Sequence, residues 1–175
     1  MNKVNSYKNR IFLLTGFMAS GKSFTGRKAA DELNCDFIDL DEQIETQEFC
    51  SIAEIFEEKG EEYFRALETE VFSNIIASRK TVSIIAAGGG FPLKKENQKL
   101  MNEVSVVFIN TDFDIILSRL NNSGKVSRPL LKNKKDEEIK KLYEKRLSVY
   151  KSTADYIVET ENELIELIRK LAKAA

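Results

Sequence analysis

An eight-residue glycine loop constrains the fold of this chain more than any other feature of its sequence. Residues 16–23 read Gly-Phe-Met-Ala-Ser-Gly-Lys-Ser and fit the phosphate-loop pattern of glycine, any four residues, then Gly-Lys-Ser. The loop follows a short apolar run, 11–15, and precedes a segment, 24–33, whose small and apolar residues suit a helix packed on a sheet. The motif requires this order of strand, loop and helix. The sequence therefore predicts a buried strand that leads into a phosphate-binding loop.

The residue types in this loop suit the binding of phosphate groups. Gly16 and Gly21 let the backbone curl so that successive N–H groups point inward, and the next helix adds the positive end of its dipole. Lys22 can reach the β- and γ-phosphates of a nucleotide, and the Ser23 hydroxyl can bind Mg²⁺. A chance Gly-Lys-Ser in a surface loop is the alternative, but it leaves the flanking strand and helix unexplained. We therefore expect a site for a nucleoside triphosphate.

Composition limits the class of protein. The 175 residues suit one domain, and 42% hydrophobic with 31% charged residues is the mix of a globular protein. A net charge of −1 gives no reason to expect a nucleic acid or a membrane as partner. The first six residues lack the apolar core of a secretion signal, and the two cysteines have no metal-binding or disulfide pattern. We expect a cytoplasmic monomer, and because the chain has no histidine, any general base must be a carboxylate or another group.

Apolar runs alternate with amphipathic segments along the chain. The expected strands are 11–15, 36–40, 82–87, 104–109 and 156–158. The expected helices follow Lys22, Asp41, Ile52, Glu61, Pro92, Thr111, Asp136 and Glu161. Strands that alternate with helices favour a parallel sheet covered by helices on both faces. The fold class is therefore α/β, with three layers and a five-stranded sheet.

One polar segment, 121–135, is too long for an ordinary turn. It contains Gly124 and several lysines. A solvated loop explains this composition, and so does a mobile flap that closes over a nucleotide. The residues alone leave both interpretations open.

Two carboxylates follow the second predicted strand. Alternation along 36–40 sends Asp39 and Asp41 to the same side, at the strand end where ligands of open α/β sheets bind. Phosphoryl transfer needs one carboxylate near Mg²⁺ and another to orient or deprotonate the acceptor hydroxyl. Two surface acids that cap the next helix would give the same pattern.

An arginine and three consecutive glycines form the remaining pattern. Arg65 could pair with Glu61 or Glu68 on an exposed helix face, or it could serve a site. The glycines at 88–90 follow a buried strand and let the backbone approach a ligand closely, although a flexible turn would look similar.

Taken together, these motifs resemble those of the bacterial shikimate kinases over roughly 11–171. The resemblance rests on the glycine loop, Asp39-x-Asp41 followed by Ile44-Glu45, Gly60-Glu61 with Phe64-Arg65-x-x-Glu68, Gly88-Gly89-Gly90, Arg128-Pro129-Leu130-Leu131 and Arg146-x-x-x-Tyr150. It implies a phosphate-loop kinase fold with strand order 2-3-1-4-5. It also implies Mg²⁺-dependent transfer of the ATP γ-phosphoryl group to the 3-hydroxyl of shikimate, on the route to chorismate and the aromatic amino acids.

The resemblance also assigns residues to roles. Those implied for ATP are Gly16, Ala19, Ser20, Gly21, Lys22, Ser23, Phe24, Arg119 and Arg128. Those implied for shikimate are Asp41, Phe56, Phe64, Arg65, Gly88, Gly89, Gly90 and Arg146. Lys22, Asp41 and Arg128 are implied as catalytic, and Ser23 and Asp39 as Mg²⁺ ligands. Ala19 departs from the family, which usually has glycine there.

The implied organisation is one domain, 1–175. Its core comprises 10–120 and 136–173, its substrate-binding helices about 41–79, and its lid about 121–135.

Two other functions remain as alternatives. A different small-molecule kinase, such as a gluconate kinase, would share the fold and the glycine loop, but Arg65, Arg146 and the three glycines argue against it. A regulatory nucleotide-binding protein without catalysis would be favoured by a degenerate loop or by loss of Asp41 or Arg65, and the sequence has neither defect.

Overall fold

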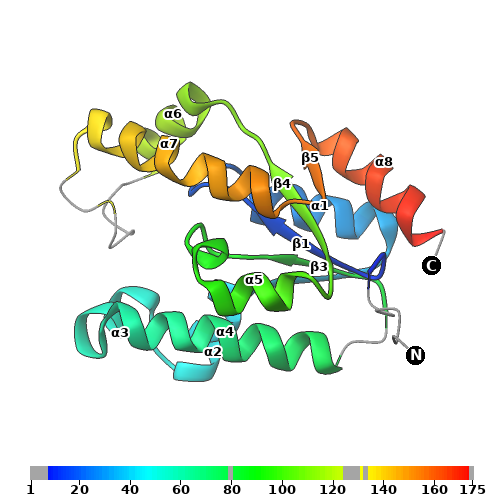
Figure 1. Ribbon diagram of the computed structural model, residues 1–175, viewed down its shortest axis with the longest axis horizontal. Coiled ribbons are helices and arrows are strands. Elements are labelled where there is room, and N and C mark those ends of the chain that lie inside the picture. Colours follow the sequence, from blue (N-terminus) through cyan, green and yellow to red (C-terminus); the bar gives the residue numbers. More distant parts are fainter. Residues whose placement is uncertain (1–7, 79–80, 124–130, 132–133, 174–175) are drawn as a thin grey trace.

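A computed structural model of the chain describes residues 8–78, 81–123, 131 and 134–173 (Figure 1). Its described strands form one parallel five-stranded sheet of order β2-β3-β1-β4-β5, which confirms the predicted fold class and strand order. The strands are β1 (Ile11–Thr15), β2 (Asp36–Asp39), β3 (Ser83–Ala86), β4 (Ser105–Ile109) and β5 (Tyr156–Val158). All five predicted strands are present, and three of them are one or two residues shorter than expected.

Helices cover both faces of the sheet, as the alternating pattern predicted. They are α1 (Lys22–Leu33), α2 (Leu40–Glu48), α3 (Ile52–Glu58), α4 (Gly60–Ser78), the 3₁₀ turn η1 (Phe91–Leu93), α5 (Lys95–Met101), α6 (Phe113–Ser123), α7 (Asp136–Thr153) and α8 (Glu161–Ala172). Because side chains alternate along β1, Phe12 and Leu14 face α1 and α8, whereas Ile11 and Leu13 face α2 to α5. In Figure 1, α1 and α8 accordingly lie together on one side of the sheet, and α2 to α4 on the other.

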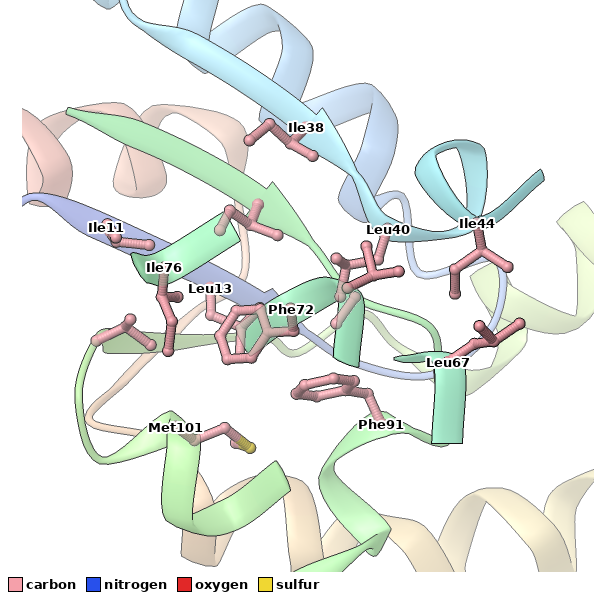
Figure 2. Packing of buried hydrophobic residues seen from close by; sticks show 14 of the residues in the cluster. Ile11, Leu13, Ile38, Leu40, Ile44, Leu67, Phe72, Ile76, Phe91 and Met101 are labelled. Atoms are coloured by element: carbon pink, nitrogen blue, oxygen red, sulfur yellow. The ribbon is translucent and has the colours of Figure 1, made fainter. Parts of the chain in front are cut away.

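The larger core anchors the helix that carries Arg65. Along α4, apolar side chains repeat at helical spacing and are buried against β1 and β3. Figure 2 shows Phe72 of α4 beside Phe91 of η1 and near Leu13, and the two aromatic rings meet edge to face with centroids 5.0 Å apart. This packing joins α4 to the turn that follows β3.

The local structure around Asp39 and Asp41 differs from the prediction. The strand ends at Asp39 and the helix α2 begins at Leu40, so strand alternation does not determine where the Asp41 side chain points. Instead, the carboxylate of Asp39 caps α2 and accepts a hydrogen bond from the Asp41 N–H (3.0 Å). The capping interpretation was therefore correct for Asp39.

The segment after Thr111 also differs in detail. Helix α6 continues to Ser123, so Arg119 lies inside this helix and the predicted start of the lid at 121 is helical. Most of 121–135 lies outside the described residues, but Leu131 is buried against α6 and α7.

Two properties of the described residues bear on the expectations from composition. No helix among them has the length and apolar character needed to cross a membrane. Cys35 and Cys50 both carry free thiols.

We predict that Gly26→Val destabilises the fold. Gly26 lies where α1 meets the sheet, and an added Cβ would come within 2.6 Å of the Phe37 ring and 2.9 Å of Leu14. Overpacking of this kind costs about 1–3 kcal/mol, and the urea midpoint should fall accordingly. Asp31→Ala, on the exposed face of the same helix, should leave the midpoint nearly unchanged. Equal midpoints for the two variants would contradict this account of the contact.

Candidate active site

A cavity of about 1060 Å³ lies where the first three strands end. It is lined by the glycine loop, by α2, α3 and α4, by the turn 88–90, and by residues of α6 and α7. Its size matches that of a pocket for small-molecule ligands. Fifteen of the predicted site residues line it: Ala19, Gly21, Lys22, Ser23, Phe24, Asp39, Asp41, Phe56, Phe64, Arg65, Gly88, Gly89, Gly90, Arg119 and Arg146.

Three predicted residues are not among these lining residues. Gly16 and Ser20 belong to the loop without lining the cavity, and the Ser20 side chain is buried behind it. Arg128 lies outside the described residues. Sequence reasoning missed nine lining residues, which are Met18, Thr25, Glu45, Ser51, Ile52, Ala53, Glu68, Ala87 and Asn122. Glu68 is the most consequential of these, because it is a fully buried acid.

The glycine loop adopts the curled backbone that its glycines allow. Gly16 and Gly21 have φ values of 149° and 96°, and Ala19 takes a left-handed φ of 59°. A Cβ in place of hydrogen on Gly21 would also approach Arg119 Nη1 to 3.1 Å. Gly21 is the N-cap residue of α1 and has no side chain that could cap the helix. The first N–H groups of α1, at the cavity, therefore have no capping side chain. The arrangement suits an anion.

Lys22 holds the loop together from inside. Its ammonium donates hydrogen bonds to the carbonyls of Gly16 (3.0 Å) and Phe17 (2.8 Å), and the side chain is almost completely buried. Arg119 Nη1 donates to the Ala19 carbonyl (3.1 Å) and so ties α6 to the same loop. Both cations therefore lie at the loop, where phosphate charge would be placed.

Ser23 and Asp39 bring two oxygen ligands together. The Ser23 hydroxyl donates to Asp39 Oδ2 over 2.5 Å, which joins the start of α1 to the end of β2. Hydroxyl and carboxylate oxygens suit Mg²⁺, which binds to few protein ligands and completes its shell with water and phosphate. The described residues contain no cluster of three or more acidic or cysteine ligands, so a dedicated protein cage is absent from that part of the chain.

Two carboxylates, each with a buried oxygen, face the turn after β3. Asp41 Oδ1 and Glu68 Oε1 have no hydrogen-bond partner among the described residues. A Cβ on Gly88 would lie 3.1 Å from the first atom and 2.7 Å from the second, so both oxygens point to the same small space. Burial raises the pKa of Asp41 to about 6, and the charge of Asp39 acts in the same direction while Lys22 opposes it. Burial likewise raises the pKa of Glu68 to about 7, against the attraction of Arg65.

Arg65 makes both ion pairs that the sequence suggested, one of them with a buried rather than an exposed acid, and it also lines the cavity. Its guanidinium donates to Glu61 (3.0 Å) and to buried Glu68 (2.5 Å). The same guanidinium packs against Gly90, where an added Cβ would lie 2.5 Å from Nη2. The two interpretations offered by the sequence thus hold together, because the ion pairs fix the arginine at the cavity wall.

Arg146 and Tyr150 of α7 share a hydrogen-bond partner, which accounts for their spacing of four residues. Residues four apart share one face of a helix, and both side chains donate to the Gly89 carbonyl, Arg146 Nη1 at 3.3 Å and the Tyr150 hydroxyl at 2.5 Å. Arg146 is buried, and neither an acidic partner for it nor a hydrogen-bond partner for its Nε occurs among the described residues. Burial also raises the pKa of Tyr150 to about 12, so its hydroxyl remains a donor. The cavity therefore contains a buried cation that lacks a protein counter-ion in the described chain.

Comparison with known proteins gives consistent matches. The sequence model of the shikimate kinase family matches residues 18–175. The shikimate kinase of Aquifex aeolicus (strain VF5) is 41% identical over 163 residues, which cover 93% of this chain and 93% of that protein. The solved structure of a shikimate kinase from Acinetobacter baumannii in complex with shikimate superposes with a TM-score of 0.83 at 28% identity, covering 97% of this chain and 95% of the other.

A gluconokinase structure is a weaker match. That enzyme, from Sinorhizobium meliloti 1021, gives a TM-score of 0.53 at 16% identity and covers 97% of this chain and 95% of its own. At this identity the likeness extends to the fold alone.

We predict that Glu68 makes stability depend on pH. Its pKa is about 7 in the folded chain against an ordinary value of 4.5, so between these values the folded state retains a proton that the unfolded state has released. Rising pH therefore favours unfolding, by roughly 1–3 kcal/mol between pH 5 and pH 8. Urea midpoints across this range should fall more steeply for the wild type than for Glu68→Gln.

The matched control is Glu61→Gln, which removes the more exposed partner of the same arginine. It should retain the pH dependence of the wild type. If Glu68→Gln retained it as well, burial of this carboxyl would not be its source.

Proposed function

The chain belongs to the shikimate kinase family, and we propose that it transfers the γ-phosphoryl group of ATP to the 3-hydroxyl of shikimate. The product, shikimate 3-phosphate, leads to chorismate and the aromatic amino acids. One observation carries the proposal: a single cavity joins a phosphate loop to two arginines, the half-buried Arg65 and the buried Arg146, across the turn 88–90. Shikimate is an anion with several hydroxyl groups, and its carboxylate needs cationic recognition.

The two arginines differ in the charge they offer. Arg65 is already paired with Glu61 and Glu68, whereas Arg146 has no acidic partner among the described residues. We assign the carboxylate of shikimate to both, with Arg146 supplying most of the uncompensated positive charge. The ring then lies beside the backbone of Gly88–Gly90, with Phe56 and Phe64 on the side of α3 and α4.

Asp41 is the group we assign to the acceptor hydroxyl. It lines the cavity, its buried Oδ1 has no hydrogen-bond partner among the described residues, and its pKa of about 6 lies close to neutral pH. A general base works best when its pKa is near the operating pH. The loose transition state of phosphoryl transfer asks only for orientation and modest assistance from such a base.

The nucleotide occupies the loop side of the cavity in this proposal. The N–H groups of the loop and Lys22 hold the phosphates, Arg119 and Phe24 flank the rest of ATP, and Arg128, outside the described residues, completes the set. Ser23 and Asp39 would hold Mg²⁺ between them and the phosphates. When bound, Mg²⁺ neutralises charge on the phosphate oxygens.

The organisation of the chain forms part of the same proposal. Helices α2 to α4 provide the shikimate side, 121–135 serves as a lid, and the protein acts as a cytoplasmic monomer. Light scattering of the purified protein tests the monomer.

The activity has a direct test. In a coupled assay with ATP and Mg²⁺, ADP release should depend on shikimate and should be negligible with gluconate. Release that is independent of shikimate, or equal with gluconate, would refute the assignment.

We predict that Asp41→Asn lowers kcat by about 10²–10⁴-fold, the range for a positioned acid–base group. The substitution preserves shape while removing the basic oxygen. Initial rates at saturating ATP and shikimate separate kcat from KM. Glu42→Gln, the adjacent acid on α2, which pairs with Arg27 at the surface, is the matched control and should keep wild-type kcat. A normal kcat in Asp41→Asn would remove Asp41 from the chemistry.

We predict that Arg146→Ala weakens shikimate binding by roughly 10- to 150-fold, the equivalent of a charge-assisted hydrogen bond of ~1.5–3 kcal/mol. Calorimetric titration with ADP should give nearly unchanged affinity. Lys145→Ala, an exposed cation on the same helix, controls for net charge. An equal loss of ADP affinity in Arg146→Ala would show that the arginine supports the fold rather than the substrate.

A further inference from the structure

We infer that Asn97 is a positioning residue for shikimate recognition. It fixes the position of the part of α4 that carries Arg65 relative to the turn 88–90, which follows β3. The inference rests on the proposed function. Asn97 lies on α5, lines no part of the cavity and is completely buried. An amide in such a place is costly unless its hydrogen bonds are satisfied.

Both ends of this amide are satisfied, and each binds one wall of the site. Asn97 Nδ2 donates to the carbonyl of Phe91 (2.9 Å), the residue that directly follows the glycine turn. Asn97 Oδ1 accepts from the hydroxyl of Thr69 (2.7 Å), one helical turn after Arg65 on α4. One buried side chain therefore joins the two segments that flank the predicted position of shikimate.

The number of protons on each group determines which group donates in the hydrogen-bond network around Thr69. The Thr69 hydroxyl carries one proton, and its oxygen lies 2.7 Å from Asn97 Oδ1 and 3.0 Å from the carbonyl of Arg65. Because Asn97 must present its NH₂ group to Phe91, its oxygen needs the Thr69 proton. Lys94 Nζ, with three protons, can then donate to Thr69 (3.1 Å) and to the Arg65 carbonyl (3.4 Å). The network thus ends on the backbone of Arg65.

The distance between Arg65 and the turn 88–90 can change little without a clash or a lost contact. An added Cβ on Gly90 would lie within 2.6 Å of three guanidinium atoms of Arg65, so the arginine and the turn are already in close contact. The turn is short, since Phe91 N–H donates to the Gly88 carbonyl over 3.0 Å. The Phe72–Phe91 contact also joins these segments, but apolar packing is not directional. Directional bonds through Asn97 are what fix the position along α4.

The test uses two pairs of variants. Asn97→Leu removes the amide at similar volume, and Gln98→Met is its matched control, because Gln98 Nε2 donates to the Pro92 carbonyl (2.8 Å) from the same helix without contacting Thr69. Thr69→Val removes the hydroxyl while keeping the shape of the side chain, and Thr69→Ser retains the hydroxyl. If Asn97→Leu does not fold, the Thr69 variants still test the inference.

We expect Asn97→Leu and Thr69→Val to raise KM for shikimate by roughly 10-fold, the lower end of the effect of losing a charge-assisted hydrogen bond. KM for ATP should change less than about twofold, and both Thr69→Ser and Gln98→Met should behave as the wild type. Lowered stability with an unchanged KM for shikimate in Thr69→Val would overturn the inference, because a merely structural residue gives that result.

A second readout needs no substrate. The side-chain Nε–H signal of Arg65 in a ¹⁵N-labelled sample, assigned by its loss in Arg65→Lys, reports the placement of the guanidinium. It should shift or broaden in Asn97→Leu and Thr69→Val and stay in place in Gln98→Met. A wild type inactive on shikimate would contradict the proposed function alone, while a changed Arg65 signal would still support the positioning role. An unchanged signal would overturn it.

Discussion

The close approach of the turn 88–90 to its neighbours is the constraint on which the site depends. Gly88 faces two carboxylates, Gly90 lies against the guanidinium of Arg65, and a Cβ on Gly89 would come within 3.4 Å of the backbone of the glycine loop. Positive φ values among the described glycines occur at 16, 21 and 60, so the turn needs glycine for space and not for backbone conformation. Any side chain at 88 or 90 would push an acid or an arginine out of the cavity wall.

Charge within this small volume is distributed unequally. Glu68 compensates Arg65 from a fully buried position, and Asp41 lies close enough to Glu68 to help raise its pKa. Two adjacent buried acids favour a state in which one of them holds a proton. Arg146, which has no acidic partner among the described residues, then leaves a positive charge for a carboxylate ligand. In the proposed function, the site would therefore recognise an anion through the imbalance of its charges rather than through the number of its arginines.

Sequence patterns predict the helices and strands and most of the side chains that line the cavity, but not the contacts between them. The five strands follow from short apolar runs, whereas their spatial order came from the family resemblance, since hydrophobic pattern does not encode which strands pair. Asp39 and Asp41 both line the cavity, as alternation predicted, but Asp41 does so from α2, because the carboxylate of Asp39 caps that helix and the strand ends one residue earlier than expected. Glu68 was noticed as a possible partner for Arg65 and as the last residue of the Phe64-Arg65-x-x-Glu68 motif, and spacing on a helix cannot reveal that this acid is fully buried at a cavity.

The link between Thr69 and Asn97 marks the limit of such reasoning. The two residues are 28 positions apart, on different helices, and neither belongs to a motif of the glycine-loop kind. Only packing brings α4 and α5 together on the same face of the sheet. A half-buried threonine and a buried asparagine in amphipathic helices are ordinary residues in the sequence, so their pairing becomes visible only in three dimensions.

The pairing of β1 with β3 fixes the glycine loop beside the turn 88–90. Leu14 is in register with Ala86, and Ala87 N–H donates to the Leu14 carbonyl (3.1 Å), so the glycine loop and the glycine turn leave the sheet side by side. Both strands are fully buried in the centre of the sheet. Reacting atoms must be held within roughly 3–3.5 Å for efficient transfer, and loops attached to adjacent central strands can maintain such a separation. The proposed nucleotide and acceptor sides are therefore carried by two adjacent, fully buried strands of the sheet.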